Sequence, residues 1–277
     1  MKYKLICSDI DGTLVDQDGR IPEENLKAIK RLREEGVLFA ICSGRVYYAA
    51  SLVARYYEIP GCIVSCNGGI VVNDETDEII QIHNLPMDLR NRICDIADRY
   101  HCVVGLNQRD GIVYRGWDGE ENVIYAQANE MYGPKTGRRM RIEQVEDYRK
   151  RLQEEELVKL SIWARSEEDY KKLCEDIEKI PDITSASALK WQLEITNGNV
   201  SKRTGVRNLM DYYGIRKEEV VCIGDTMNDY PMVKNAGLGI AMANGEEKLK
   251  EAAAYVTDTN NNAGLAKAIY ACLEGKI

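Results

Sequence analysis

Two aspartates stand one residue apart near the start of the chain, Asp9 and Asp11, directly after a short apolar run at 5–7. Alternate residues of an extended chain project to the same side, so both carboxylates are expected to face one site. Carboxylates that lie close together repel each other unless a cation separates them or one is protonated. The pair therefore indicates metal or acid–base chemistry, although a simple Asp-Gly turn explains the same residues.

A second acidic cluster, residues 224–229, follows the apolar run 220–223. It contains Asp225, Asn228 and Asp229, whose carboxylate and amide oxygens are the ligands that Mg²⁺ prefers, with a phosphate able to complete the octahedron. A glycine-aspartate turn alone does not require a second carboxylate and an amide at this spacing. Metal binding is therefore the better interpretation of this cluster.

Two further positions suit a phosphoryl group. Ser43, Gly44 and Arg45 follow an apolar run, where a hydroxyl and free backbone N–H groups at a helix N-terminus attract phosphoryl oxygens. Ser43 would equally serve as a helix cap. Lys202 opens a predicted helix at 202–213, where a cation opposes the helix dipole, so its position hints at another role.

The elements expected to position these residues alternate between short β-type runs and amphipathic helices. The predicted strands are 4–7, 37–42, 62–65, 220–223 and 238–241. The predicted helices are 23–35, 46–57, 202–213 and 264–273. Such alternation predicts an α/β fold with a parallel sheet covered by helices, and ligands bind such sheets at the carboxyl ends of the strands.

The middle of the chain has a different pattern and predicts an inserted α+β layer. From about 86 to 187 we expect a helix, two strands, a long charged helical region ending near 156, and then strand, helix and strand. The basic cluster at 138–141 is interpreted as a solvated helix entrance.

Composition limits the class of protein. The 277 residues are 44% apolar and 30% charged, typical of a globular protein, and no apolar run is long enough to span a bilayer. A cytoplasmic location is the default expectation, with no membrane partner. The net charge of −8 argues against nucleic-acid binding and means that an anionic substrate needs local positive charge. The nine cysteines are expected to be reduced core residues, and Cys62 and Cys66 lack the further ligands of a zinc site.

Taken together, the clusters resemble the haloacid dehalogenase (HAD) superfamily, with its DxDGT motif, a serine or threonine after a second strand, a distant lysine and a GDxxND motif. Residues 236–245 and 262–265, with Asn67-Gly68-Gly69, look like the Cof-type phosphatase subgroup. A long insertion between Ser43 and Lys202 resembles the type-two (C2) cap. The resemblance implies a Rossmann-like catalytic core at 1–85 and 188–277 with a cap domain at 86–187.

The resemblance also implies roles. Asp9 would be the nucleophile and Asp11 the general acid and base, while Ser43, Gly44 and Lys202 would hold the phosphoryl oxygens. Mg²⁺ would be bound by Asp9, Asp225 and the backbone carbonyl of Asp11. Asn228 and Asp229 would orient the metal shell and Lys202. The candidate substrate-binding residues are Arg45, Asn67, Arg115, Trp117, Arg138 and Arg139.

The expected function is Mg²⁺-dependent hydrolysis of small phosphate monoesters, such as sugar phosphates, nucleotides or phosphorylated cofactors, through an aspartyl-phosphate intermediate. Two alternatives remain open: phosphoryl transfer of the phosphomutase type, and a noncatalytic sensor of phosphate and metal. The chain departs from the Cof-type pattern at Arg203, where glycine is common, and at Ser43, which replaces the commoner threonine.

Overall fold

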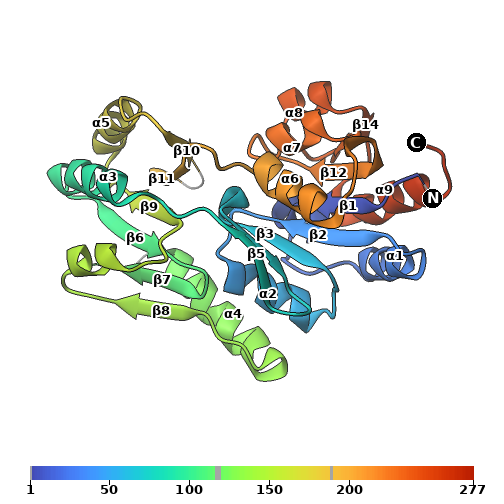
Figure 1. Cartoon of the computed structure of the whole chain (residues 1–277), viewed down its shortest axis with the longest axis horizontal. Coiled ribbons are helices and arrows are strands. Elements are labelled where there is room, and N and C mark those ends of the chain that lie inside the picture. The colour runs from blue at the N-terminus through green and yellow to red at the C-terminus, as the bar shows by residue number, and fades with distance from the viewer. Residues whose placement is uncertain (1, 116–119, 188–189) are drawn as a thin grey trace. The chain divides into compact units, whose positions relative to one another are not determined.

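The computed structural model describes residues 2–115, 120–187 and 190–277, and of residues 120–124 it describes only the backbone. Contacts divide the chain into two compact units (Figure 1). The first unit consists of Met1–Gly44, Val53–Gln81 and Ser201–Ile277, and the second of Arg45–Leu52 and Ile82–Val200.

The first unit is built on an eight-stranded sheet with the order β14-β13-β12-β1-β2-β3-β4-β5. Its strands are β1 (Leu5–Ser8), β2 (Leu38–Cys42), β3 (Cys62–Ser65), β4 (Ile70–Asn73), β5 (Glu78–Ile82), β12 (Val220–Gly224), β13 (Leu238–Ala241) and β14 (Tyr255–Val256). The six strands from β14 to β3 pair in parallel, and β4 is antiparallel to β3. The expected parallel α/β sheet is therefore confirmed.

Helices cover both faces of this sheet, which is why its strands are apolar on both sides. These helices are α1 (Glu23–Glu34), α6 (Lys202–Tyr213), α7 (Tyr230–Asn235), α8 (Glu247–Ala252) and α9 (Gly264–Leu273), while α2 (Tyr47–Tyr56) is divided between the two units. Helix α1 packs beside α9, and α6 packs beside α7. Leu5 and Cys7 of β1 share one buried cluster with Leu209 of α6 and Met232 of α7. Alternate residues of β1 thus anchor the layer that carries Lys202.

The second unit is a six-stranded sheet with the order β10-β11-β9-β6-β7-β8. Its strands are β6 (Val103–Asn107), β7 (Gly111–Tyr114), β8 (Arg141–Gln144), β9 (Lys159–Trp163), β10 (Ile183–Ser187) and β11 (Gln192–Asn197). The pairs are antiparallel except for the parallel pair of β7 and β8. Helices α3 (Met87–Arg99) and α5 (Glu167–Ile177) pack together over one face, and α4 (Glu120–Thr136) contacts β8.

The structure corrects the sequence-based expectation for residues 138–156. Helix α4 contains Pro134 and ends before Gly137, whose φ of 66° is incompatible with a continuing right-handed helix. The basic cluster at 138–141 therefore leads into strand β8, which pairs with β7, and is not a helix entrance. Tyr148–Gln153 forms only a short 3₁₀ helix.

Strand β11 lies beyond the expected end of the insertion at residue 187. It pairs with both β9 and β10, so the division by contacts falls at Val200. In the described ranges, no helix combines the length and the apolar character that crossing a membrane requires.

Candidate active site

The carboxyl edge of the parallel sheet gathers the predicted residues of the first unit. Strand β1 lies between β2 and β12, and the chain passes from β1 to β2 on one side and returns to β12 on the other. Residues that follow these three strands therefore leave the same edge at the point where the strand order reverses, the usual ligand site of such sheets. Asp9, Ser43 and Asp225 follow β1, β2 and β12 respectively.

Lys202 lies between two carboxylates in the interior of the site. Its Nζ donates to Oδ1 of Asp9 and to Oδ1 of Asp229, both at 2.6 Å. The Lys202 and Asp229 side chains have no exposed surface and that of Asp9 is 7% exposed. The cation that opposes the dipole of α6 is therefore compensated by two anions, which explains its position at the first residue of that helix.

Besides binding Lys202, Asp229 binds the backbone of the turn that follows β12. Its Oδ2 accepts hydrogen bonds from the backbone N–H groups of Asp225 and Thr226, at 3.0 and 3.1 Å. Both oxygens of Asp229 are thus occupied by protein donors. Asp229 therefore positions Lys202 and the turn that carries Asp225.

Asp225 is bound by a residue of the first loop. The hydroxyl of Thr13 donates to Oδ1 of Asp225 at 3.2 Å. A Cβ on Gly12 would lie 2.1 Å from Oδ2 of the same carboxylate, and Gly12 has a φ of 81°. Only glycine fits between the two acidic loops, for reasons of both space and backbone conformation.

Burial first, and neighbouring negative charge second, raise the pKa values of two aspartates in the site. Burial raises the pKa of Asp9 well above the usual range of an aspartate; the ammonium of Lys202 opposes this rise, and the charge of Asp229 adds to it. Burial and Asp229 likewise raise the pKa of Asp225 to about 7. Burial alone would lower the pKa of Lys202, but the carboxylates of Asp229 and Asp9 outweigh it and raise that pKa. The charge of Asp11 also acts on Asp9 and Asp225.

The donor set fits a hard divalent cation. One oxygen from each of Asp9, Asp225 and Asp229 lies within 4.8 Å of the others, and all three residues are buried. Because one lysine cannot neutralise three buried carboxylates and Asp11, a cation bound through oxygen would offset both the burial and the repulsion that raise the pKa values of Asp9 and Asp225. The residues present therefore suit Mg²⁺.

Ser43 and Gly44 lie together with Asn67. The backbone N–H of Asn67 donates to the carbonyl of Ser43 at 3.0 Å, and a Cβ on Gly44 would lie 3.0 Å from the amide oxygen of Asn67. Ser43 is buried. The loops after β2 and β3 thus form one polar group of residues at the carboxyl edge of the sheet.

Comparison with known proteins places this arrangement in a family. Residues 6–269 match the family of haloacid dehalogenase-like hydrolases. The chain belongs to the haloacid dehalogenase-like hydrolase family. It is 30% identical to the 5-amino-6-(5-phospho-D-ribitylamino)uracil phosphatase YitU of Bacillus subtilis, over 96% of each chain.

Solved HAD structures agree with the family assignment. A haloacid dehalogenase-like hydrolase from Bacteroides thetaiotaomicron is 28% identical, with a TM-score of 0.81 over 98% of this chain and all of the other. A sugar phosphatase of HAD subclass IIB has the same fold, with 21% identity and a TM-score of 0.78 over 99% of this chain and 100% of the other. The chain is thus a Cof-type HAD phosphatase, a phosphoric monoester hydrolase.

Three other predicted site residues of this HAD chain are either exposed or grouped with the second unit. Asn228 is exposed, and its side-chain oxygen accepts from the hydroxyl of Thr226 at 2.7 Å. Asp11 is exposed beside Gly12. Arg45 begins the 45–52 segment, which groups with the second unit.

Of the candidate substrate residues expected in the insertion, two arginines have protein partners, one arginine is exposed, and the tryptophan lies outside the described residues. Arg115 pairs with Asp98 at 3.0 Å and lies over the ring of Tyr148. Arg138 donates to the hydroxyls of Tyr47 and Ser51, at 3.1 and 2.6 Å. Arg139 is exposed, and Trp117 lies outside the described residues.

Sequence reasoning gave no role to two residues that hold the first loop of this HAD site. Thr13 belongs to the DxDGT motif, and its hydroxyl binds Asp225. The amide of Asn244 donates to the carbonyl of Gly12 at 2.9 Å, while its oxygen accepts from the backbone of Asn260. Asn244 stands in the 236–245 motif that resembles the Cof-type pattern, so the motif was the available signal.

Proposed function

We propose that the chain hydrolyses small phosphate monoesters with Mg²⁺ as cofactor and Asp9 as nucleophile. The substrates would be sugar phosphates, nucleotides or phosphorylated cofactors. The observation that carries the proposal is the buried group in which Lys202 binds Asp9 and Asp229 while Asp225 lies beside them. It combines a nucleophile, a cation for the phosphoryl oxygens and a metal site at one edge of the sheet.

In the first half-reaction, a carboxylate oxygen of Asp9 attacks phosphorus in line with the ester bond. The bond between phosphorus and the leaving oxygen breaks, and Asp9 becomes an aspartyl phosphate. Within the described ranges only Oδ1 of the Asp9 carboxylate has a hydrogen-bond partner, so we assign Oδ2 to the attack. Asp11 gives its proton to the leaving oxygen, which departs as an alcohol.

In the second half-reaction, Asp11 takes a proton from water, and the water oxygen attacks phosphorus. The bond between phosphorus and Asp9 breaks, which releases inorganic phosphate and restores the carboxylate. Lys202 and the Ser43–Gly44 turn hold the nonbridging oxygens through both steps. Asp9, Asp225 and the backbone carbonyl of Asp11 would hold Mg²⁺, which supplies the positive charge that lets an anion approach a phosphate ester.

We further propose that residues 86–187 act as the cap and that 1–85 and 188–277 form the catalytic core. Support comes from the separate sheet and separate apolar core of the second unit, which extend beyond residue 187 to include β11. The relatives named as phosphatases align along nearly the whole chain, insertion included.

The test is release of phosphate from a panel of phosphorylated metabolites, with Mg²⁺ or with EDTA. The panel includes sugar phosphates, nucleotides, flavin mononucleotide, pyridoxal phosphate and the compound for which YitU is named. We expect activity with Mg²⁺, none in EDTA, and a loss of about a thousandfold or more in Asp9→Asn, because an amide of equal size is no nucleophile. Full activity in EDTA, or in a folded Asp9→Asn variant, would contradict the proposal.

A further inference from the structure

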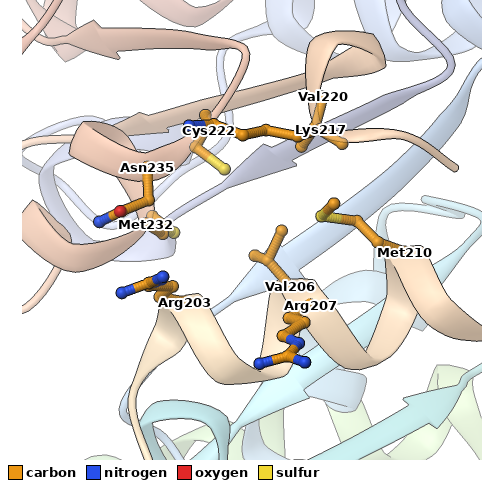
Figure 2. Close-up of a pocket in the computed structure, with 10 residues that line it drawn as sticks. Arg203, Val206, Arg207, Met210, Lys217, Val220, Cys222, Met232 and Asn235 are labelled. Carbon is orange, nitrogen blue, oxygen red and sulfur yellow. The ribbon is translucent and has the colours of Figure 1, made fainter.

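A pocket opens in the first unit between α6, β12 and α7 (Figure 2), and all of its lining residues belong to that unit. Its volume is about 140 Å³. Its inner wall is apolar and consists of Val206, Met210, Val220, Cys222 and Met232. An apolar protein cavity of about 150 Å³ holds one benzene molecule. The wall therefore accommodates one ring or a short acyl chain.

The rim of this pocket is cationic. Arg203, Arg207 and Lys217 line it, together with Asn235, and none of the described acidic side chains does, although the chain as a whole carries a net charge of −8. Figure 2 shows Arg203 at the same end of the pocket as Asn235. Positive charge around an apolar wall is complementary to a ligand with an apolar body and an anionic group.

Two of these cations have no anionic partner within the described parts of the chain. Neither Arg203 nor Lys217 forms a side-chain hydrogen bond or ion pair there, and both are exposed. Arg207 lies 3.8 Å from Asp211, but both side chains are more than 70% exposed, so this pair contributes little. The rim is therefore available to an external anion.

The position of Arg203 strengthens this argument. It is the second residue of α6, whose first turn has no acidic residue, so its charge opposes the helix dipole. Asp9 and Asp229 compensate the neighbouring Lys202 but do not contact Arg203. An arginine here is thus locally unfavourable unless an anion binds to it.

We propose that this pocket binds a small organic anion, with one ring or a short acyl chain against the apolar wall and a carboxylate or phosphonate group at Arg203 and Lys217. A guanidinium binds either oxyanion through two parallel hydrogen bonds. This site is separate from the catalytic aspartates and does not require the proposed reaction.

The methionines provide a local test. Of the eight methionines, Met210 and Met232 line the pocket, whereas Met227 and Met242 adjoin the turn that carries Asp225. In protein labelled with ¹³C at the methionine methyl groups, benzoate or phenylphosphonate should shift the Met210 and Met232 signals in a saturable way. Benzamide, which lacks the charge, should bind about tenfold more weakly, and acetate, which lacks the ring, should produce no shift. Met210→Leu and Met232→Leu assign the signals.

A matched pair of charge variants completes the test. Arg203→Ala should weaken the binding of the oxyanion by about tenfold. Lys234→Ala, which removes one positive charge from α7 outside the pocket lining, should leave the affinity unchanged. Binding of both benzoate and phenylphosphonate would support recognition of an oxyanion, and the ligand that binds more tightly would identify the preferred anionic group.

Several results would overturn the proposal. These are shifts confined to Met227 and Met242, an equal affinity for benzamide, no saturable shift with either oxyanion, or equal losses in the two charge variants. A dependence of the Met210 and Met232 signals on protein concentration alone would mean that a second copy of the chain covers the pocket, and would overturn it too.

Discussion

In the proposed mechanism, Lys202 and four nearby aspartates would have different roles, which follow from their contacts. Asp229 uses both oxygens on protein donors, Lys202 and the backbone of the turn, so it is a positioning residue. Asp9 gives one oxygen to Lys202, and Asp225 gives one to Thr13. The remaining oxygens of Asp9 and Asp225 are the atoms that a metal and a phosphoryl group would use. Asp11, which is exposed, is suited to exchange protons with the leaving group and with water.

Asp11→Asn tests the acid role. A poor leaving group such as an alkyl alcohol needs its proton in the transition state, while an aryl leaving group needs little help. We expect kcat/KM, which covers only the steps up to release of the leaving group, to fall by about a hundredfold or more for an alkyl phosphate and much less for p-nitrophenyl phosphate. Steady-state kinetics with both esters measure this, and equal losses would remove the acid role from Asp11.

The raised pKa of Asp225 predicts a pH dependence of the metal-free protein. An aspartate in the unfolded chain has a pKa of about 3.9, against about 7 for folded Asp225. Between these values the folded chain retains a proton that the unfolded chain has lost, so the free energy of unfolding decreases as pH rises. In EDTA, the melting temperature should therefore fall from about pH 5 to about pH 8, and Asp225→Asn should reduce this fall.

The difference between the two proteins reports on Asp225 together with its effect on Asp9, whose raised pKa acts in the same direction and is partly caused by the charge of Asp225. Burial lowers the pKa of His83, which acts in the opposite direction but equally in both proteins. Mg²⁺ should also reduce the fall in wild type, because it binds the ionised carboxylate of the folded state. The same slope in wild type and Asp225→Asn would show that Asp225 is ordinary in the folded chain.

At the residue scale, the positions of Asp9, Ser43 and Asp225 at the carboxyl edge were predictable, because each follows a strand and parallel strands end at one edge, whereas their roles stay predictions. The contacts made by Thr13 and Asn244 were not predictable from spacing. Thr13 binds a residue 212 positions away. Asn244 binds one 232 positions away. Such pairs depend on the exact relative placement of two loops, which a local pattern does not contain.

At the element scale, helix α6 links local capping to the site. The hydroxyl of Ser201 accepts from the backbone of Thr204 at 3.2 Å, and the hydroxyl of Thr204 accepts from the backbone of Ser201, which completes a capping box. Ser201→Ala should lower the free energy of unfolding by about 1 kcal/mol. It should also lower kcat several-fold, because Lys202 is the next residue. Chemical denaturation and steady-state kinetics measure the two effects.

Ser166 provides the matched control. Its hydroxyl caps α5 of the second unit in the same way, accepting from the backbone of Asp169 at 3.1 Å. Ser166→Ala should cost similar stability and leave kcat for p-nitrophenyl phosphate unchanged. If both variants lose activity in proportion to stability, the cap of α6 has no specific role in placing Lys202.

The main strands and helices of the first unit were predictable to within a residue or two, because their apolar periodicity is regular and glycines such as Gly214 mark helix ends. The region 138–156 was not. Its charged residues imitate an exposed helix, but Gly137 ends α4, and β8 forms because β7 offers it an edge. Pairing of that kind depends on tertiary context rather than on local propensity.

At the scale of the whole molecule, the proposed function gives the insertion a role in substrate selectivity. The residues around Asp9 would contact only the phosphoryl group, so we assign selectivity for the leaving group to residues 86–187. If binding of the remote part of a substrate helps to position the ester, losing that contact lowers kcat/KM.

Arg139 and Arg115 make this assignment testable. Arg139 is exposed and forms no side-chain hydrogen bond or ion pair with the described residues, so Arg139→Ala should lower kcat/KM for the metabolite substrate and spare p-nitrophenyl phosphate. Arg115 is held by Asp98 and Tyr148, so Arg115→Ala should lower the melting temperature without changing the preference between the two esters. Parallel kinetic losses for both esters in Arg139→Ala would place selectivity in the core.

Trapping the phosphoenzyme tests the central claim most directly. Asp11→Asn should accumulate the aspartyl phosphate, because attack by water lacks its base. Borohydride reduces an acyl phosphate to an alcohol, so the variant quenched during turnover with Mg²⁺ and p-nitrophenyl phosphate, whose leaving group needs little acid catalysis, should yield homoserine at position 9 when its peptides are sequenced by mass spectrometry. Without substrate, position 9 should remain aspartate. Homoserine at another aspartate, or at none while substrate is consumed, would contradict Asp9 as the nucleophile.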